Sequence, residues 1–79
     1  MVDRTILANP AHVRFADLIA LCTRYFGEPR ISGSHHIFRM PWPDDPRINL
    51  QSDGAMAKPY QVRQVIKAID RWETTHGTP

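Results

Sequence analysis

The chain has 79 residues, 42% of them hydrophobic and 23% charged, which is typical of one small globular domain and excludes two. At this size folding buries only roughly 60% of the surface of the unfolded chain, so we expect a thin core and no cleft between domains. The single cysteine, Cys22, excludes an internal disulfide and a metal site made of paired thiols. The net charge of +2 does not by itself indicate a nucleic-acid partner, but most basic residues are arginines, whose planar guanidinium suits phosphate.

The sequence contains no segment typical of a membrane span or a signal peptide. Its longest apolar stretch, residues 16–22, is interrupted by Asp17 and is far shorter than the roughly 20 residues that a span requires. Asp3 and Arg4 near the start lead into no apolar block. We expect a single cytoplasmic domain over residues 1–79, with its core at about residues 10–73 and a disordered tail at residues 74–79.

A first helix is predicted from Asn9 and Pro10 to about Phe26. Asn accepts hydrogen bonds from the first free amides, Pro fits the first helical position, and Gly27 is a suitable C-terminal stop. Apolar residues that recur at steps of three and four should face the core, namely Phe15, Leu18, Ile19, Cys22 and Phe26. Cys22 is therefore interpreted as a small buried apolar residue and not as a nucleophile.

Three short strands are predicted next. Residues 28–32 contain Pro29 and can form only an edge strand, which a turn at Gly33 and Ser34 joins to a strand over residues 35–40. Residues 41–46 contain three prolines and form a loop before the third strand, residues 47–51. Strand alternation assigns to the helix side His36, Phe38, Met40, Ile48 and Leu50, and to the open side His35, Ile37, Arg39, Arg47, Asn49 and Gln51.

A second helix is predicted to begin at about Tyr60, after a turn at residues 52–54 and a flexible approach at residues 55–58. Its apolar stripe consists of Val62, Val65, Ile66, Ile69 and Trp72, and its opposite face carries a basic ridge, Arg63, Lys67 and Arg71. The elements predict an α+β fold in which both helices cover one face of a three-stranded antiparallel sheet. This α-β-β-β-α architecture resembles that of double-stranded RNA-binding domains.

Two adjacent histidines, His35 and His36, are the first candidates for chemistry. Neighbouring side chains of a strand point to opposite faces, so the two imidazoles cannot share one substrate or metal ion. His36 is interpreted as a partly packed structural residue. On the open face, His35 could transfer a proton while Arg39 and Arg47 stabilise phosphate charge, as RNA cleavage by its own 2′-hydroxyl requires. Spacing alone leaves an inert polar residue as the alternative.

Two segments carry a family resemblance: Gly33-Ser34-His35-His36-Ile37-Phe38-Arg39, which follows Phe26-Gly27, and Lys58-Pro59-Tyr60-Gln61-Val62-Arg63-Gln64-Val65. They resemble the HicA family, the ribonuclease toxins of bacterial toxin–antitoxin pairs, over roughly residues 10–73 and most specifically over residues 33–38. The resemblance implies a double-stranded RNA-binding-domain-like fold, cleavage of mRNA without metal or cofactor, and inhibition by a HicB-type antitoxin. The family's catalytic histidine, the first after Gly-Ser, maps onto His35.

The expected site consists of residues with separate roles. His35 would act as general base or acid, Arg39 or Arg47 would stabilise the phosphorane charge, and Gly33 and Ser34 would admit the RNA backbone. Three residues complete the expectation. Lys58, at the mouth of the second helix, would bind phosphate together with free amides. The apolar Ile37 would be covered by the antitoxin, and Trp42 would stack on a base or anchor that partner, with packing of the proline turn as its alternative.

The chain departs from the commoner family pattern in two places. The Trp42 loop is longer and richer in proline, which leaves the RNA preference open, and Leu50-Gln51-Ser52 lacks the Pro-His that often follows. Asp44 and Asp45, between prolines, are interpreted as turn-capping residues rather than an acid–base pair. No metal site is expected from the histidines, because His12, His35, His36 and His76 have no regular ligand spacing.

Two other functions remain open at this point. A non-catalytic RNA-binding module would bind RNA in a salt-sensitive way, through shape and phosphate contacts that do not involve His35. In such a module the basic ridge would follow the RNA backbone. The alternative interpretation of the ridge is a solvated helix face. A protein-docking domain would bind a partner and no RNA. Specific DNA binding is expected of the antitoxin and not of this chain.

Overall fold

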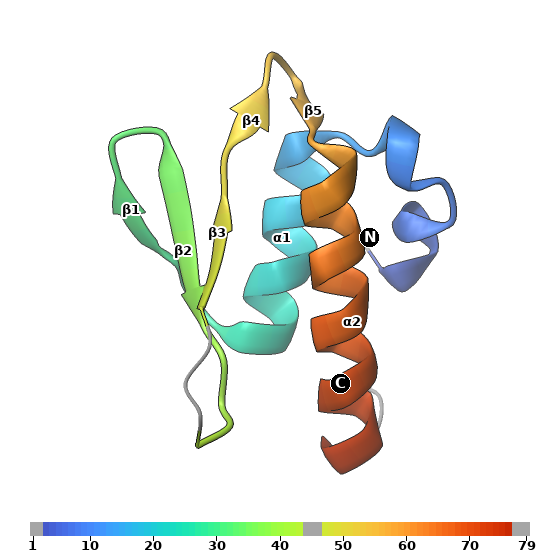
Figure 1. The fold of residues 1–79 in the computed structure, drawn as a ribbon, viewed down its shortest axis with the longest axis vertical. Coiled ribbons are helices and arrows are strands. Elements are labelled where there is room, and N and C mark those ends of the chain that lie inside the picture. Colours follow the sequence, from blue (N-terminus) through green and yellow to red (C-terminus); the bar gives the residue numbers. More distant parts are fainter. Residues whose placement is uncertain (1–2, 44–46, 77–79) are drawn as a thin grey trace.

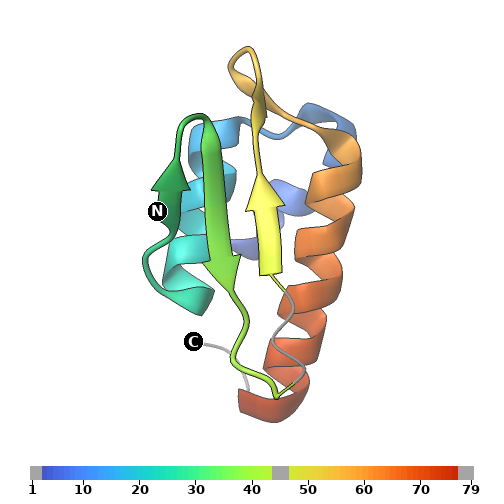
Figure 2. The same ribbon diagram turned by 60° about the vertical axis from the view of Figure 1, so that its left-hand side comes forward.

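The structure is a computed structural model that describes residues 3–43 and 47–76. In this part of the chain, helices α1 (Phe15–Phe26) and α2 (Pro59–His76) cover one face of a three-stranded antiparallel sheet (Figure 1). The strands are β1 (Arg30–Ser32), β2 (His35–Arg39) and β3 (Arg47–Leu50), with β2 in the middle. Figure 2 shows the sheet in front of both helices, so the other face of the sheet is open. The predicted α+β class, with two helices and a three-stranded antiparallel sheet, is confirmed.

The strand register confirms the predicted alternation. In the centre of the sheet, Ile37 lies opposite Arg30 on one side and Asn49 on the other. Ser32 pairs with His35, which makes Gly33 and Ser34 the connecting two-residue turn. Gly33 has φ 60°, a left-handed conformation that glycine adopts without the steric cost of a Cβ.

The first helix begins later than predicted. Asn9 does cap a helix, but this is the short 3-10 helix η2 (Pro10–His12), and α1 starts only at Phe15. Between them Val13 is extended, and its carbonyl accepts a hydrogen bond of 2.8 Å from the amide of Ala57. The expected continuous helix is wrong because this tertiary hydrogen bond holds the chain in an extended conformation. Gly27 ends α1 as predicted, with φ 86°.

Residues 52–57 form a hairpin, so the predicted turn is right at Gly54, whereas residues 52 and 53 and part of the predicted flexible approach are strands. Strands β4 (Ser52–Asp53) and β5 (Met56–Ala57) pair antiparallel, and Gly54 lies between them with φ 62°. Met56 also forms a bridge with Arg14. The hairpin is therefore stabilised by the segment that precedes α1, and these partners are distant in sequence.

The ordered part of the chain extends beyond the expected core at both ends. A 3-10 helix η1 (Arg4–Leu7) comes before it, with Leu7 buried and Arg4 paired with Asp70 and Glu73 of α2. At the other end α2 continues to His76, so the predicted disordered tail is wrong for residues 74–76. Residues 77–79 lie outside the described part.

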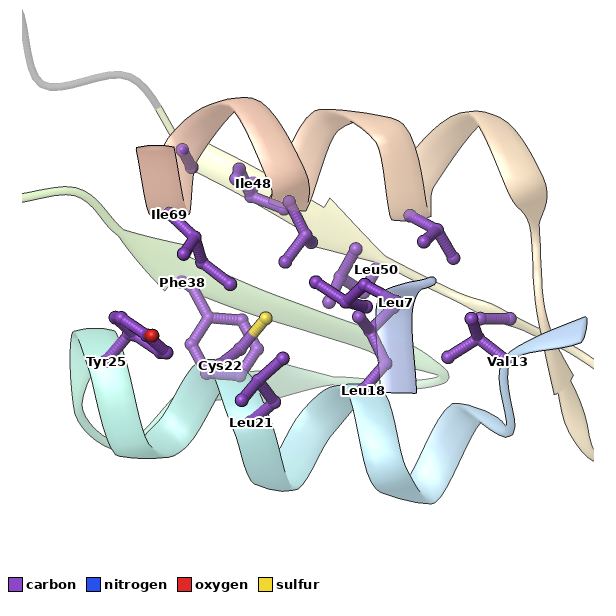
Figure 3. Packing of buried hydrophobic residues seen from close by; sticks show 14 of the residues in the cluster. Leu7, Val13, Leu18, Leu21, Cys22, Tyr25, Phe38, Ile48, Leu50 and Ile69 are labelled. Carbon is purple, nitrogen blue, oxygen red and sulfur yellow. The ribbon is translucent and has the colours of Figure 1, made fainter. Parts of the chain in front are cut away.

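The hydrophobic core lies between the sheet and the two helices (Figure 3). Its largest fully buried side chains are Phe38, Leu18, Leu21, Leu50, Ile69, Val13, Val62, Val65 and Cys22. The buried face of α1 is rotated from the predicted one, because Leu21 and Tyr25 are buried while Phe15, Ile19 and Phe26 lie at its margin. The rotation follows from α2, whose Trp72 packs edge-on against Tyr25 with 5.3 Å between ring centroids.

In α2 the predicted stripe is confirmed at Val62, Val65 and Ile69, while Ile66 and Trp72 are half-buried. Within the described part of the chain, neither helix has the length and apolar character that crossing a membrane requires.

Candidate functional site at the open face of the sheet

His35 is the first residue of β2 and lies half-buried on the open face. Its Nδ1 is 3.0 Å from Oδ1 of Asn49 on β3. Because an amide oxygen can only accept, Nδ1 carries the proton of this hydrogen bond, and Nε2 keeps its lone pair in the neutral ring. Asn49 thus orients the imidazole and selects the tautomer that can accept a proton at Nε2.

The His35 ring borders a hollow of about 330 Å³. The hollow lies where β3 runs beside the first turns of α2, an arrangement visible in Figure 2. Its lining consists of His35, Arg47, Asn49, Gln51, Tyr60, Gln61 and Gln64. A small polar group can therefore lie next to His35 with side chains of three elements around it. We call this cavity the His35 hollow.

Gln61 holds β3 to α2. Its side chain is almost completely buried, its Nε2 donates to the carbonyl of Asn49 at 3.3 Å, and its Oε1 accepts from the amide of Gln51 at 3.1 Å. Gln61 therefore occupies the hydrogen-bonding position of a further strand along the outer edge of β3. The sequence carried a signal for this role, a polar residue next to the apolar stripe of the second helix, but its partner could not be predicted.

Of the two predicted arginines, one reaches the His35 hollow. Arg39 and Arg47 lie directly opposite each other on β2 and β3, and both are exposed. Arg47 also lines the His35 hollow, whereas Arg39 does not. Arg47 is thus the cation in position to act on a group bound beside His35.

The turn before His35 is tied to the end of β3. The Oγ of Ser34 accepts a hydrogen bond of 2.9 Å from Nε2 of Gln51, and Gly33 is exposed at the tip. Neither of these two residues lines the His35 hollow, but Ser34 is hydrogen-bonded to Gln51, which does. Lys58 is half-buried just before α2, and it does not line the His35 hollow.

A second hollow, of about 400 Å³, adjoins the first. It shares Arg47 and Gln64 with the His35 hollow, and its other lining residues are Met40, Trp42, Ile48, Lys67, Ala68 and Arg71. The two hollows form a groove along β3 and α2 that leads from His35 to Trp42. Two members of the predicted basic ridge line this groove, Lys67 and Arg71, while Arg63 does not.

Trp42 is anchored to α2 in this structure. The guanidinium carbon of Arg71 lies 4.3 Å from the centroid of its ring, a cation–π contact. Trp42 is half-buried, and its Nε1 is buried with no hydrogen-bond partner among the residues that the structure describes. Asp44 and Asp45, predicted to cap the turn, lie outside the described residues.

Ile37 and His36 occupy opposite faces of β2, as predicted. Ile37 is half-buried between its cross-strand neighbours on the open face. His36 lies on the helix side, where its ring meets that of Phe15 edge-on with centroids 5.2 Å apart. Among the described residues, no three His, Cys, Asp or Glu side chains gather in a way that could hold a metal ion.

No protein-family model, curated protein or solved structure matches the chain.

Proposed function

We propose that this protein is a cytoplasmic, metal-independent endoribonuclease of the HicA toxin type, which cleaves mRNA, blocks translation and is neutralised by a HicB-type antitoxin. One observation carries the proposal. His35 donates from Nδ1 to Asn49 at 3.0 Å while its ring borders a hollow that Arg47 also lines. A neutral imidazole held at Nδ1 presents Nε2 as a general base, and an arginine that lines the same hollow can stabilise phosphate charge.

In the proposed reaction, the 2′-hydroxyl of the RNA attacks the adjacent phosphorus. His35 Nε2 accepts the hydroxyl proton as the new O2′–P bond forms, and the P–O5′ bond breaks while O5′ takes a proton from water. His35 then gives its proton to the hydroxide that remains, which restores the neutral imidazole. The products are a 2′,3′-cyclic phosphate and a 5′-hydroxyl. Arg47 stabilises the charge on the phosphorane, and Arg39 contacts the RNA backbone farther from the scissile bond.

The remaining site residues take supporting roles. Gly33 and Ser34 admit the backbone at the end of the groove that holds His35, and Lys58 binds a flanking phosphate near the start of α2. The antitoxin covers the open face over Ile37 and Trp42. The α-β-β-β-α order, with both helices on one face of the sheet, supports the double-stranded RNA-binding-domain-like assignment; the β4–β5 hairpin is an insertion before α2.

The test compares wild-type protein with the His35→Ala variant on end-labelled mRNA in EDTA. We expect the wild type to cleave and the variant, folded by circular dichroism, to be slower by a factor of roughly 10² or more. Cleavage retained in His35→Ala, or lost from the wild type in EDTA, contradicts the proposal.

A non-catalytic RNA-binding module is the second candidate. The groove favours it, since it continues from His35 past Lys67 to the aromatic ring of Trp42 and so offers charge and stacking over a length that catalysis does not need. Salt-sensitive RNA binding by a wild-type protein that cleaves nothing would select this function.

A further inference from the structure

The lining of the His35 hollow has the chemistry of a base-binding site. Its carboxamide side chains are Asn49, Gln51, Gln61 and Gln64. A carboxamide presents a donor beside an acceptor, which matches the pattern on the edges of nucleobases. A site for phosphate alone would be lined mainly by cations, yet Arg47 is the only arginine or lysine among the described lining residues.

Three of these carboxamides already have at least one hydrogen bond within the protein. Asn49 Oδ1 accepts from His35, Gln51 Nε2 donates to Ser34, and Gln61 bonds to the β3 backbone. Gln64 is exposed on α2, and no hydrogen bond joins its side chain to any other residue that the structure describes. Its donor and acceptor are therefore available to a ligand.

Tyr60 supplies an aromatic surface at the same place. It precedes Gln64 by one helical turn, so both lie on one side of α2 and both line the His35 hollow. Its side chain is 54% exposed, and its hydroxyl makes only a long contact of 3.4 Å with Gln61 Nε2. Packing of the protein's own core does not explain an aromatic ring in this position, whereas stacking with a base does.

We propose that the His35 hollow is a nucleobase pocket, in which a base next to the scissile phosphate stacks on Tyr60 and forms hydrogen bonds with Gln64. The proposal rests on the ribonuclease function for its ligand, RNA, and adds the part of the RNA that the pocket recognises. Tyr60 contributes affinity for any base, because every base has an aromatic face, while Gln64 discriminates among bases.

The test measures equilibrium binding to short 2′-O-methyl oligoribonucleotides, which cannot be cleaved because their 2′-oxygens are blocked. Each sequence is compared with an abasic ribose-phosphate chain of the same length and charge. We expect the wild type to bind the base-containing chain more tightly, by roughly tenfold or more for the favoured base. In the Tyr60→Ala variant, the ratio of the affinity for the base-containing chain to the affinity for the abasic chain should fall close to one. The Gln64→Ala variant should lose the preference among bases.

Two variants serve as controls. Tyr60→Phe keeps the ring and should bind like the wild type. Arg63→Ala removes an exposed cation of α2 that lines neither hollow, so it should leave the ratio between base-containing and abasic chains unchanged. Equal wild-type affinity for the two kinds of chain, no affinity for either, or a ratio that Tyr60→Ala leaves unaltered overturns the pocket.

These outcomes separate from those of the ribonuclease assay. If the wild type binds bases through Tyr60 but cleaves no RNA, the proposed nucleobase pocket stands and the proposed enzymatic function is wrong. If the wild type cleaves RNA with His35 but binds base-containing and abasic chains equally, the proposed function stands and the proposed pocket is wrong.

Discussion

His35 and Asn49 form a diagonal contact between β2 and β3, with 3.0 Å between Nδ1 and Oδ1. Asn49 lies directly opposite Ile37 in the strand register, so its side chain must lean along the sheet to reach His35. The carbonyl of Asn49 in turn accepts from Gln61. The orientation of the proposed base therefore depends on α2, which acts on it through β3.

The Asn49→Ala variant tests this orientation. Without the acceptor at Nδ1, the neutral His35 ring populates both tautomers and rotates more freely, so we expect the rate of RNA cleavage to fall by roughly ten- to a hundredfold. Single-turnover kinetics would measure the change. Ile37→Ala is the matched control on the same face, and an equal loss in that variant would show a general effect of the open face.

Gln61→Ala is expected to destabilise the fold. The substitution leaves the carbonyl of Asn49 and the amide of Gln51 without their side-chain partner at the edge of β3. We expect the free energy of unfolding to fall by about 1–3 kcal/mol, measured by urea denaturation. Gln64→Ala, which removes an exposed carboxamide of the same helix, should change it by less than about 0.5 kcal/mol. Similar values for both variants would contradict the role given to Gln61.

The Cys22 thiol is expected to be unreactive in the folded protein. Burial raises its pKa from an ordinary 9.0 to about 12, so almost no thiolate is present at pH 8. We expect the disulfide reagent DTNB to modify the protein slowly in buffer and rapidly in concentrated urea. Fast modification of the native protein at pH 8 would contradict the packing of Cys22.

The same shift has a consequence for stability at high pH. A group whose folded pKa is raised stabilises the protein fully below its unfolded pKa, and this contribution is lost as the pH rises through the folded value. The contribution of Cys22 should therefore decline between pH 9 and about pH 12. Denaturation of the Cys22→Ala variant across this range provides the comparison, since its stability should depend less on pH.

Tyr25 is expected to ionise above its ordinary pKa of 10.0. Burial raises the pKa of its hydroxyl, and the hydrogen bond of 2.9 Å to Glu73 and the charge of that carboxylate raise it further. In the Tyr60→Phe variant, which leaves Tyr25 as the only tyrosine, absorbance at alkaline pH would follow this ionisation. Adding Glu73→Gln should lower the midpoint, and a midpoint at or below pH 10.0 in the parent variant would contradict the contact.

Local patterns were sufficient for several features. The period of two in residues 35–40 separated His35 from His36, and it assigned Phe38 to the core because successive strand side chains alternate between faces. Gly27 and Gly33 marked a helix end and a turn because both positions require a left-handed backbone. These features depend on neighbours in the sequence and therefore could be predicted.

Other features depended on partners distant in sequence. The sequence identified Asn9 as a helix cap. Because Val13 is hydrogen-bonded to Ala57, however, α1 begins only at Phe15. Leu21 and Tyr25 replaced part of the predicted buried face because η1 and α2 lie on that side of α1. Helical periodicity locates the apolar side of a helix. Which residues at the margin of that side are buried depends on the elements that pack against it.

The sequence by itself determined the α+β class, the open face of the sheet and the place of His35 on it. Only the tertiary structure decided which side chains surround that histidine. Asn49 reaches it on a diagonal that depends on strand register, and Gln61 and Gln64 reach the same hollow only because α2 lies beside β3. Faces follow from the local geometry of the backbone, whereas contacts between elements follow from how those elements pack.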